Sequence, residues 1–307
     1  MSMVRKAIKK YLQERRALGF KLYDAGRLLF QFADYLEEHK TNIITQELAM
    51  RWACLSDKCQ PKYWAQRLSA VRIFAHYYSA IDPRTEIPAQ GLLPFKNKRT
   101  IPYIYTEKQI LRLIKAARTL YSKTGIQAST FVTLFGLLTV TGMRIGEIVG
   151  LDREDVDLEE GVLLVKKAKL DRRRLIPVHP STVKALQCYV RHRDKANPKP
   201  KTTSFFVSEA GTRLTAGTVR WNFNKLSCQI GLRHPSDRSG PRIHDLRHSF
   251  AVHMMQNWYR QGKNVEKLLP QLAVYLGHRN LNCTYWYMTA TPELLKLAAK
   301  RAAERIN

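Results

Sequence analysis

The sequence predicts a mainly α-helical chain of two parts, with a small β-hairpin or sheet in the C-terminal part, an α+β class. Apolar residues recur at helical spacing over most of the chain, as in Leu28, Leu29, Phe32 and Leu36. A proline-rich stretch interrupts this pattern at residues 82–105. Further along, two short apolar runs, GVLLV and LIPV, flank a basic turn, which is typical of a hairpin.

The first part, residues 1–81, is predicted to be a bundle of four or five short helices, because no strand-like alternation interrupts it. The helix near residues 45–54 has the weakest pattern of the set. Residues 82–105 are predicted to be an extended linker that ends in a basic run at 96–99. This run can contact phosphates, although a solvated charge run has the same composition. The prolines of the linker are Pro83, Pro88, Pro94 and Pro102.

The second part, residues 106–307, begins with a capping box, in which Thr106 and Gln109 satisfy free backbone donors of a first helical turn. Helices are predicted from there to about residue 150. The β-branched and leucine-rich runs that follow predict two strands joined by a basic turn. The remaining predicted elements are strands at 161–166 and 174–178, a helix at 180–193, a short strand at 204–207, and helices to the end.

The charge of the chain is strongly positive, with 52 lysines and arginines against 25 acidic residues and a formal net charge of +27. The basic excess runs through both parts of the sequence. Self-repulsion on this scale opposes a compact state unless a polyanion offsets it, and counterion release favours such binding. The composition therefore predicts nucleic acid as a partner of both parts, although a ribosome-associated or simply basic protein has similar numbers.

Several classes of protein and site are not expected. No stretch reaches the roughly 18 apolar residues of a membrane-spanning helix, and the N-terminus lacks the apolar core of a signal peptide. We therefore expect a soluble, cytoplasmic protein without membrane contact. The five cysteines include no CxxC pair, so we expect free thiols, no disulfide and no structural zinc. We expect no cofactor.

Residues suited to chemistry gather in four segments of the second part. In the first, TVTGMRIGEIVGL, Arg144 follows a glycine turn and begins a helix, a position that suits anion binding or a structural cap. In the second, VKKAKLDRRRLIPV, Lys167 and Lys169 lie on the hairpin turn. A lysine there can reach a leaving group, although a basic turn is also typical of a solvated loop.

The third segment is RIHDLRHSFAVH. His244 and Arg247 are three residues apart and are predicted to share one helix face, where together they can hold two oxygens of a phosphate. His248 and His253 extend a histidine pattern that zinc also uses. Because the glutamate of an HExxH motif is absent, we expect no metal.

The fourth segment, LAVYLGHRNLNCTYWYMTATPELL, contains His278 and, nine residues later, Tyr287. A tyrosine in an aromatic run is usually part of a core or an interface. In their order and chemistry, however, the four segments resemble the catalytic pattern of the tyrosine recombinases, also called phage-type integrases. The resemblance rests on TGMRIGE, the KAKLDRRRLIPV hairpin, HDLRHSF and LGH followed by a tyrosine, and it covers about residues 106–295.

The resemblance implies a two-domain clamp, in which residues 1–81 are a helical core-binding domain, 82–105 a linker and 106–307 a tyrosine-recombinase catalytic domain. It implies site-specific DNA cleavage and rejoining through a 3′-phosphotyrosyl intermediate, in the integration or excision of a mobile element. Tyr287 is the implied nucleophile. No metal is needed, because fixed cationic side chains can stabilise the charge of a reacting phosphate.

The resemblance also implies roles for the other matched residues. Arg144 and Arg247 are expected to grip the non-bridging oxygens of the scissile phosphate. His244 and His278 are expected to complete this cradle, and His244 is also expected to assist proton transfer at Tyr287.

Two further roles follow from the same match. Lys169 is expected to protonate the leaving 5′ oxygen, chosen over Lys167 by counting back from Arg174 along the hairpin. Glu147 matches an acidic residue that orients Arg144.

The implied partner is double-stranded DNA with inverted half-sites, bound by a homo-tetramer that can include companion recombinases. The alternatives are DNA relaxation of the type IB topoisomerase kind and a catalytically silent sequence-specific DNA-binding protein. One departure from the family is a long segment between Phe250 and Leu276, which fits a lengthened helix pair joined near Gly262. This length is typical of transposon-borne members and indicates a changed partner or DNA contact.

Overall fold

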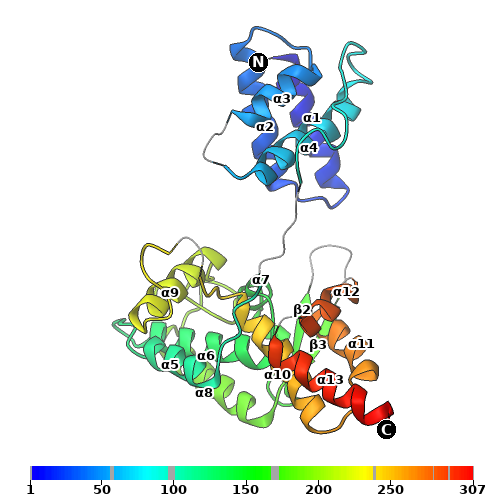
Figure 1. Ribbon diagram of the computed structural model, residues 1–307. Coiled ribbons are helices and arrows are strands. Elements are labelled where there is room, and N and C mark those ends of the chain that lie inside the picture. Colours follow the sequence, from blue (N-terminus) through cyan, green and yellow to red (C-terminus); the bar gives the residue numbers. More distant parts are fainter. Residues whose placement is uncertain are drawn as a thin grey trace. The chain divides into compact units, whose positions relative to one another are not determined.

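The chain divides into two compact units, Met1–Thr100 and Ile101–Asn307, and each is mainly helical (Figure 1). No helix within the described part of the chain is long and apolar enough to cross a membrane. The computed structural model describes residues 2–55, 59–95, 101–166, 173–237, 240–278, 280–289 and 291–306.

The N-terminal unit is a helical bundle, as its periodicity predicts. Thr45 caps the helix with the weakest pattern by accepting a hydrogen bond from the Leu48 backbone N–H. Trp52 anchors that helix in the core, with its ring 5.1 Å from the ring of Phe32. The predicted helix near residues 45–54 is therefore confirmed. The described helices of this unit are α1 (Met3–Ala17), α2 (Tyr23–Glu38), α3 (Gln46–Cys54) and α4 (Pro61–Tyr78).

The C-terminal unit is built around helix α6, which is apolar on all sides and packs against α5, α8 and α10. The predicted capping box at Thr106 and Gln109 is present at the start of α5. The helices of this unit are α5 (Glu107–Ala117), α6 (Ile126–Thr141), α7 (Ile145–Val149), α8 (Pro180–Ala196), α9 (Ala216–Gln229), α10 (Asp245–Arg260), α11 (Val265–Leu276), α12 (Asn282–Tyr285) and α13 (Pro292–Ile306), with 3₁₀ turns at Arg153–Asp155 and Trp286–Thr289.

The C-terminal unit also contains the predicted hairpin, as part of an antiparallel sheet in the order β1-β2-β3. Strand β2 (Val162–Lys166) pairs with β3 (Arg173–Pro177). β2 starts one residue later than predicted, and β3 starts and ends one residue earlier than predicted. Strand β1 (Val156–Asp157) is too short to produce a sequence pattern. The mainly helical class with a small sheet is thus confirmed.

The strand predicted at residues 204–207 is wrong. Within the described residues this segment forms isolated bridges, one from Ser204 to Asp152 and one from Val207 to Arg213. Its apolar side chains are buried because they pack on Tyr189, whose ring lies 5.2 Å from that of Phe206. An extended, buried segment therefore has the composition of a strand without belonging to the sheet.

Helices α10, α11 and α13 and the 3₁₀ turn Trp286–Thr289 form a small core of their own. Helices α10 and α11 meet at a turn containing Gly262, whose φ is +68°, so the predicted helix pair joined near this glycine is present. Helix α13 packs against α10 of the same chain. Its Glu293 accepts hydrogen bonds from Gln256 at 3.2 Å and from Arg260 at 2.6 Å. Tyr287 is part of this core.

Candidate active site

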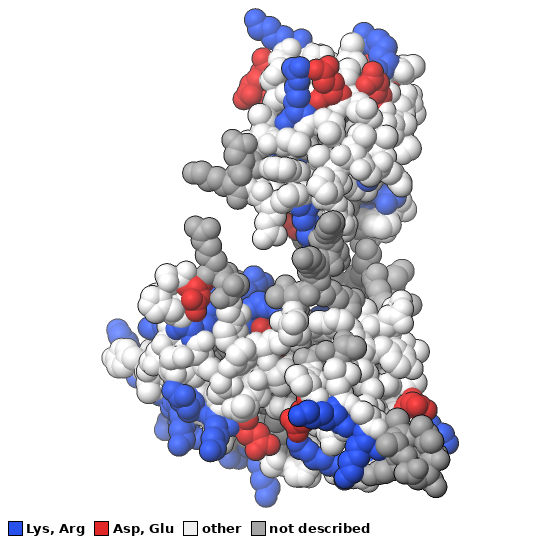
Figure 2. Space-filling model, viewed as in Figure 1, with Lys and Arg blue, Asp and Glu red and all other residues white. Residues whose placement is uncertain are grey.

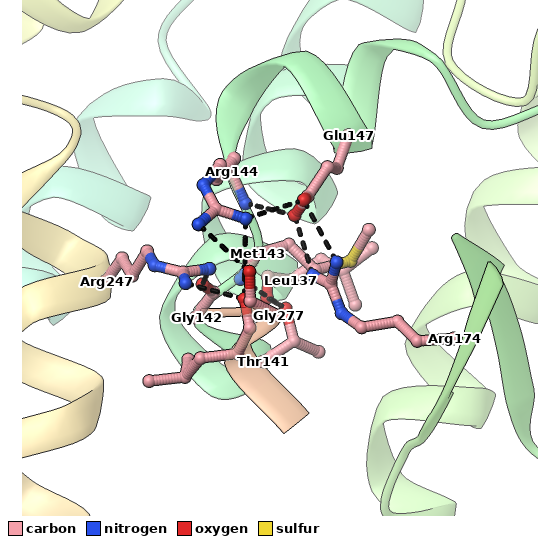
Figure 3. Close-up of polar contacts among 10 residues, drawn as sticks. Leu137, Thr141, Gly142, Met143, Arg144, Glu147, Arg174, Arg247 and Gly277 are labelled. Atoms are coloured by element: carbon pink, nitrogen blue, oxygen red, sulfur yellow. Dashed lines mark hydrogen bonds and ion pairs between the residues drawn. The ribbon is translucent and has the colours of Figure 1, made fainter. Parts of the chain in front are cut away.

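Two helix C-termini hold the arginines that the sequence singles out. Gly142 caps the C-terminus of α6 and Gly277 caps that of α11, with φ of +59° and +66°, conformations that favour glycine. Main-chain carbonyls at such ends lack helical partners. Arg247 donates from Nη1 to Gly142 O at 2.8 Å and from Nη2 to Leu276 O at 2.6 Å. The guanidinium of Arg144 makes longer contacts of 3.4 Å with Leu276 O and Gly277 O (Figure 3).

The two arginines differ in exposure. Arg247 is 2% exposed, whereas the side chain of Arg144 is 37% exposed. Burial, together with the nearby charge of Arg144, lowers the pKa of Arg247 to about 10, so it stays protonated at neutral pH. Arg247 is thus a fixed cation in the floor of the site, and Arg144 presents part of its guanidinium to solvent.

Glu147 joins Arg144 to the hairpin. Its Oε1 accepts from Nη1 of Arg144 and Nη1 of Arg174, both at 3.0 Å. Its Oε2 accepts from Nη2 of Arg174 at 2.7 Å and from the Arg144 backbone N–H at 2.9 Å. Figure 3 shows this carboxylate between the two guanidinium groups. Although burial raises the pKa of Glu147, the two arginines outweigh it and hold that pKa at about 2.

Tyr287 lies in the same region, on the 3₁₀ turn that follows α12, and is 2% exposed. Its Oη is 3.0 Å from Nδ1 of His248, which extends from α10. Burial raises the pKa of the phenol, and the charge of Arg247 acts in the opposite direction. The hydroxyl group is therefore protonated in this structure and lies beside a fixed cation.

His278 follows the glycine that ends α11 and packs beside the phenol. The rings of His278 and Tyr287 are stacked, with centroids 6.1 Å apart. Nδ1 of His278 is 2.7 Å from Oγ1 of Thr284, a fully buried side chain. This contact fixes the ring, and Nε2 is the nitrogen that faces away from it.

The cluster carries more positive than negative charge. Burial and the neighbouring arginines lower the pKa of His278 to about 4, so its imidazole is neutral at pH 7. In the described contacts, Arg144 and Arg174 share the carboxylate of Glu147, whereas Arg247 is held by main-chain carbonyls. Three guanidinium groups and one carboxylate leave an excess of positive charge, which suits an anionic ligand.

The structure brings together five of the predicted site residues, which are Arg144, His244, Arg247, His278 and Tyr287. His244 lies at the N-terminal cap of α10 and is exposed, whereas Arg247 is buried. His244 has helical φ and ψ of −67° and −24°, and partial burial and the charges of Arg247 and Arg144 lower the pKa of its imidazole. His244 and Arg247 therefore lie near one another at the start of α10.

The predicted hairpin lysine, Lys169, and its alternative, Lys167, lie outside the described residues. Arg174, from which Lys169 is counted, lies on β3 and bonds Glu147. Strand β3 of the hairpin therefore begins next to the arginine cluster.

Sequence reasoning missed three residues of the site. His248 was considered as a zinc ligand, yet it contacts Tyr287. Arg174 and Thr284 were not assigned roles, because their partners are 27 and 6 residues away and no local pattern links them. Among the described residues, no group of three or more His, Cys, Asp or Glu side chains is arranged to hold a metal ion.

Comparison with known proteins gives a consistent picture. The profile of the Phage integrase family matches residues 104–293, a range that includes every site residue described above. A Sinorhizobium fredii protein described as integrase/recombinase y4rB is 43% identical over 99% of this chain and 98% of its own length. The tyrosine recombinase XerC of Chlamydia trachomatis is 29% identical over 75% of this chain and 68% of its own.

Solved structures with the same fold include two bound to DNA. The Tn1549 transposon integrase in complex with transposon right end DNA has a TM-score of 0.66 at 17% identity, covering 98% of this chain and 100% of its own. The XerH recombinase bound to a palindromic difH substrate has a TM-score of 0.64 at 19% identity, covering 96% and 83%. At these identities the likeness shows the fold.

Proposed function

This chain belongs to the phage integrase family and is a tyrosine-type site-specific recombinase, and we propose that Tyr287 is the nucleophile with which it cuts and rejoins DNA. The phenolic oxygen attacks the scissile phosphate, forms a 3′-phosphotyrosyl bond and releases a free 5′-hydroxyl. Attack by a 5′-hydroxyl on that bond reverses the step. Because the phosphodiester energy is kept in the covalent intermediate, rejoining needs no ATP.

The observation that carries this proposal is the excess positive charge of the arginine cluster beside a buried phenol. Arg144 and Arg247 are held by carbonyls of the same helix end, so their guanidinium groups lie close together. Fixed donors of this kind stabilise charge that develops on the non-bridging oxygens of a phosphate. His278 and His244 complete the cradle as neutral donors.

The leaving 5′ oxygen needs a proton, and Lys169 is the residue that we propose to supply it, with Lys167 as the alternative on the same turn. The start of this hairpin is anchored to the arginine cluster through Arg174 and Glu147. Lys169 precedes Arg174 by five positions in the sequence, which supports this assignment. The reaction then needs no divalent metal, because arginines, histidines and a lysine take over its roles.

We propose double-stranded DNA with inverted half-sites as the substrate, bound by a homo-tetramer, with integration or excision of a mobile element as the outcome. The net charge of +27 supports this partner. On the face seen in Figure 2, Lys and Arg side chains gather over the C-terminal unit. Residues 1–81 act as the core-binding domain, 82–105 as the linker, and companion recombinases join the same assembly. The protein acts in the cytoplasm, where bacterial DNA lies.

The test is strand cleavage of a nicked half-site DNA, taken from the flanks of the gene, in the presence of EDTA. A covalent protein–DNA complex is expected for the wild type and for Tyr285→Phe, since Tyr285 is about half exposed, and its loss is expected for Tyr287→Phe, which changes the buried tyrosine. Loss in Tyr285→Phe instead would contradict the assignment of the nucleophile. Relaxation of supercoiled DNA of any sequence by a monomer would favour the topoisomerase alternative, and DNA binding without cleavage would favour the silent one.

A further inference from the structure

The phenol of Tyr287 has a specific partner that the family resemblance did not indicate. Nδ1 of His248 lies 3.0 Å from Tyr287 Oη, which is hydrogen-bonding distance, although the two residues are 39 positions apart in the chain. The side chain of His248 is 13% exposed. Two largely buried groups with matching donor and acceptor atoms therefore face one another at the reacting oxygen.

The surroundings of His248 fix the orientation of its ring. It packs edge-on against His244, with ring centroids 4.7 Å apart, and against Trp286, at 5.6 Å. On the side away from the phenol, Nε2 lies 3.9 Å from Oδ1 of Asp245. The side chain of Asp245 is 1% exposed and is also held by Arg242 at 2.8 Å. A buried carboxylate near Nε2 favours the tautomer that carries its proton there, which leaves Nδ1 as an acceptor.

The other two histidines are placed less well for the phenolic proton. His278 uses its Nδ1 on Thr284 and stacks on the phenol ring instead of meeting its oxygen. His244 touches the His248 ring in the described contacts and lies at the exposed start of α10. Among the described histidines, His248 is the one with a ring nitrogen at Tyr287 Oη.

We propose that His248 accepts the phenolic proton of Tyr287 during attack on the phosphate and returns it during rejoining, an inference that rests on the proposed function. In cleavage, the bond from Tyr287 Oη to phosphorus forms and the bond from phosphorus to O5′ breaks. The phenolic proton moves to Nδ1 of His248. The electron pair of the broken bond stays on O5′, which takes a proton from the general acid assigned to Lys169.

The shifted pKa values of His248 and Tyr287 indicate that the proton moves during the attack on the phosphate and not before it. Burial, His244 and the nearby arginines lower the pKa of His248 to about 4, and burial raises the pKa of the Tyr287 phenol. Before DNA binds, the proton therefore stays on the phenol and the nucleophile is unreactive. As the oxygen bonds to phosphorus, its proton becomes strongly acidic, and the nearby Asp245 carboxylate stabilises the imidazolium that forms.

The experiment compares two replacements that separate hydrogen bonding from proton transfer. The amide oxygen of His248→Asn can occupy the place of Nδ1 and accept the hydrogen bond, but it cannot take the proton. His248→Ala removes both abilities. His253→Asn is the matched control, since His253 is a partly buried histidine on the same helix whose charged neighbours are Glu107, Arg260 and Glu293.

The readouts are the single-turnover rate of covalent complex formation on the nicked half-site DNA and the affinity for uncleaved DNA. General base catalysis contributes about 100-fold to 10,000-fold, so both His248 variants should slow cleavage by at least about 100-fold. Affinity in both should stay within about threefold, and His253→Asn should cleave within about threefold of the wild type. Retained DNA affinity shows that a variant is folded. If His248→Ala does not fold, His248→Asn alone tests whether proton transfer to His248 is needed.

Two results are decisive and distinguishable. Cleavage by a DNA-binding His248→Asn within about threefold of the wild-type rate would overturn the inference, because a hydrogen bond alone would then suffice. Absence of a covalent complex in the wild type itself would overturn the proposed function before the variants are compared.

Discussion

Glu147→Gln tests the part of the site that depends most on buried charge. The side chain of Glu147 is 9% exposed and accepts four hydrogen bonds, two from Arg174 and two from Arg144. Glutamine keeps the shape but replaces one carboxylate oxygen with an NH₂ group. That group then faces arginine donors, so hydrogen bonds are lost and two guanidinium groups lose their counter-charge.

The magnitude follows from the pKa of Glu147, which is about 2 in the folded chain and 4.5 for a free side chain. At pH 7 this difference corresponds to about 3 kcal/mol of folding free energy. Because the folded pKa is depressed, the stabilisation is present above the unfolded pKa and is lost as the pH falls toward 2. It should shrink to roughly 1.5 kcal/mol at pH 3. For a unit of this size, 3 kcal/mol lowers Tm by about 6–12 °C.

The assay is urea unfolding of the full chain, wild type and variant, at pH 7 and pH 3. Glu293→Gln is the control, because its ion pair with Arg260 is more than half exposed on both sides and should contribute at most about 1 kcal/mol. We expect a large gap between wild type and Glu147→Gln at pH 7 and a smaller one at pH 3. A gap below about 1 kcal/mol at pH 7, or one that widens in acid, would refute the reasoning.

Three further predictions concern the same cluster. Gly142→Ala should lose at least about 2 kcal/mol in urea unfolding, because its φ is +59° and the added Cβ would lie 2.5 Å from Phe250 Cδ1; a loss below about 0.5 kcal/mol would contradict this. Arg247→Lys should slow covalent complex formation by about 100-fold while DNA affinity changes little, since a single ammonium lacks the planar fork whose two nitrogens bond Gly142 O and Leu276 O; an equal loss of affinity would make Arg247 a docking residue. Lys169→Ala should be slow on ordinary DNA and recover on DNA with a 5′-bridging sulfur, which leaves without a proton; recovery by Lys167→Ala in its place would move the general acid to that position.

Much of the site could be predicted because its residues lie in local motifs. The glycines before Arg144 and before His278 are turn signals, and the structure shows that they end α6 and α11 and free the carbonyls that hold the arginines. The helices and the hairpin also follow from local periodicity. The order of the four segments was enough to indicate the family, which the match over residues 104–293 confirms.

The rest depends on contacts that local patterns do not encode. His248 meets Tyr287 because α10 packs against the turn after α12. Arg174 on β3 meets Glu147 on α7 through a side-chain contact that spans 27 positions of the chain. Segment 204–207 packs on Tyr189 and is therefore buried. Its apolar composition reflects this burial and does not indicate pairing in a sheet.

The central claim is that fixed side-chain cations, without a divalent ion, activate one phosphate toward Tyr287. The most direct measurement is mass spectrometry of peptides from the wild-type protein after reaction with nicked half-site DNA in EDTA. We predict a nucleotide attached through phosphate to the peptide that contains Tyr287. Attachment to any other residue, or an adduct that forms only after a divalent metal is restored, would contradict the account.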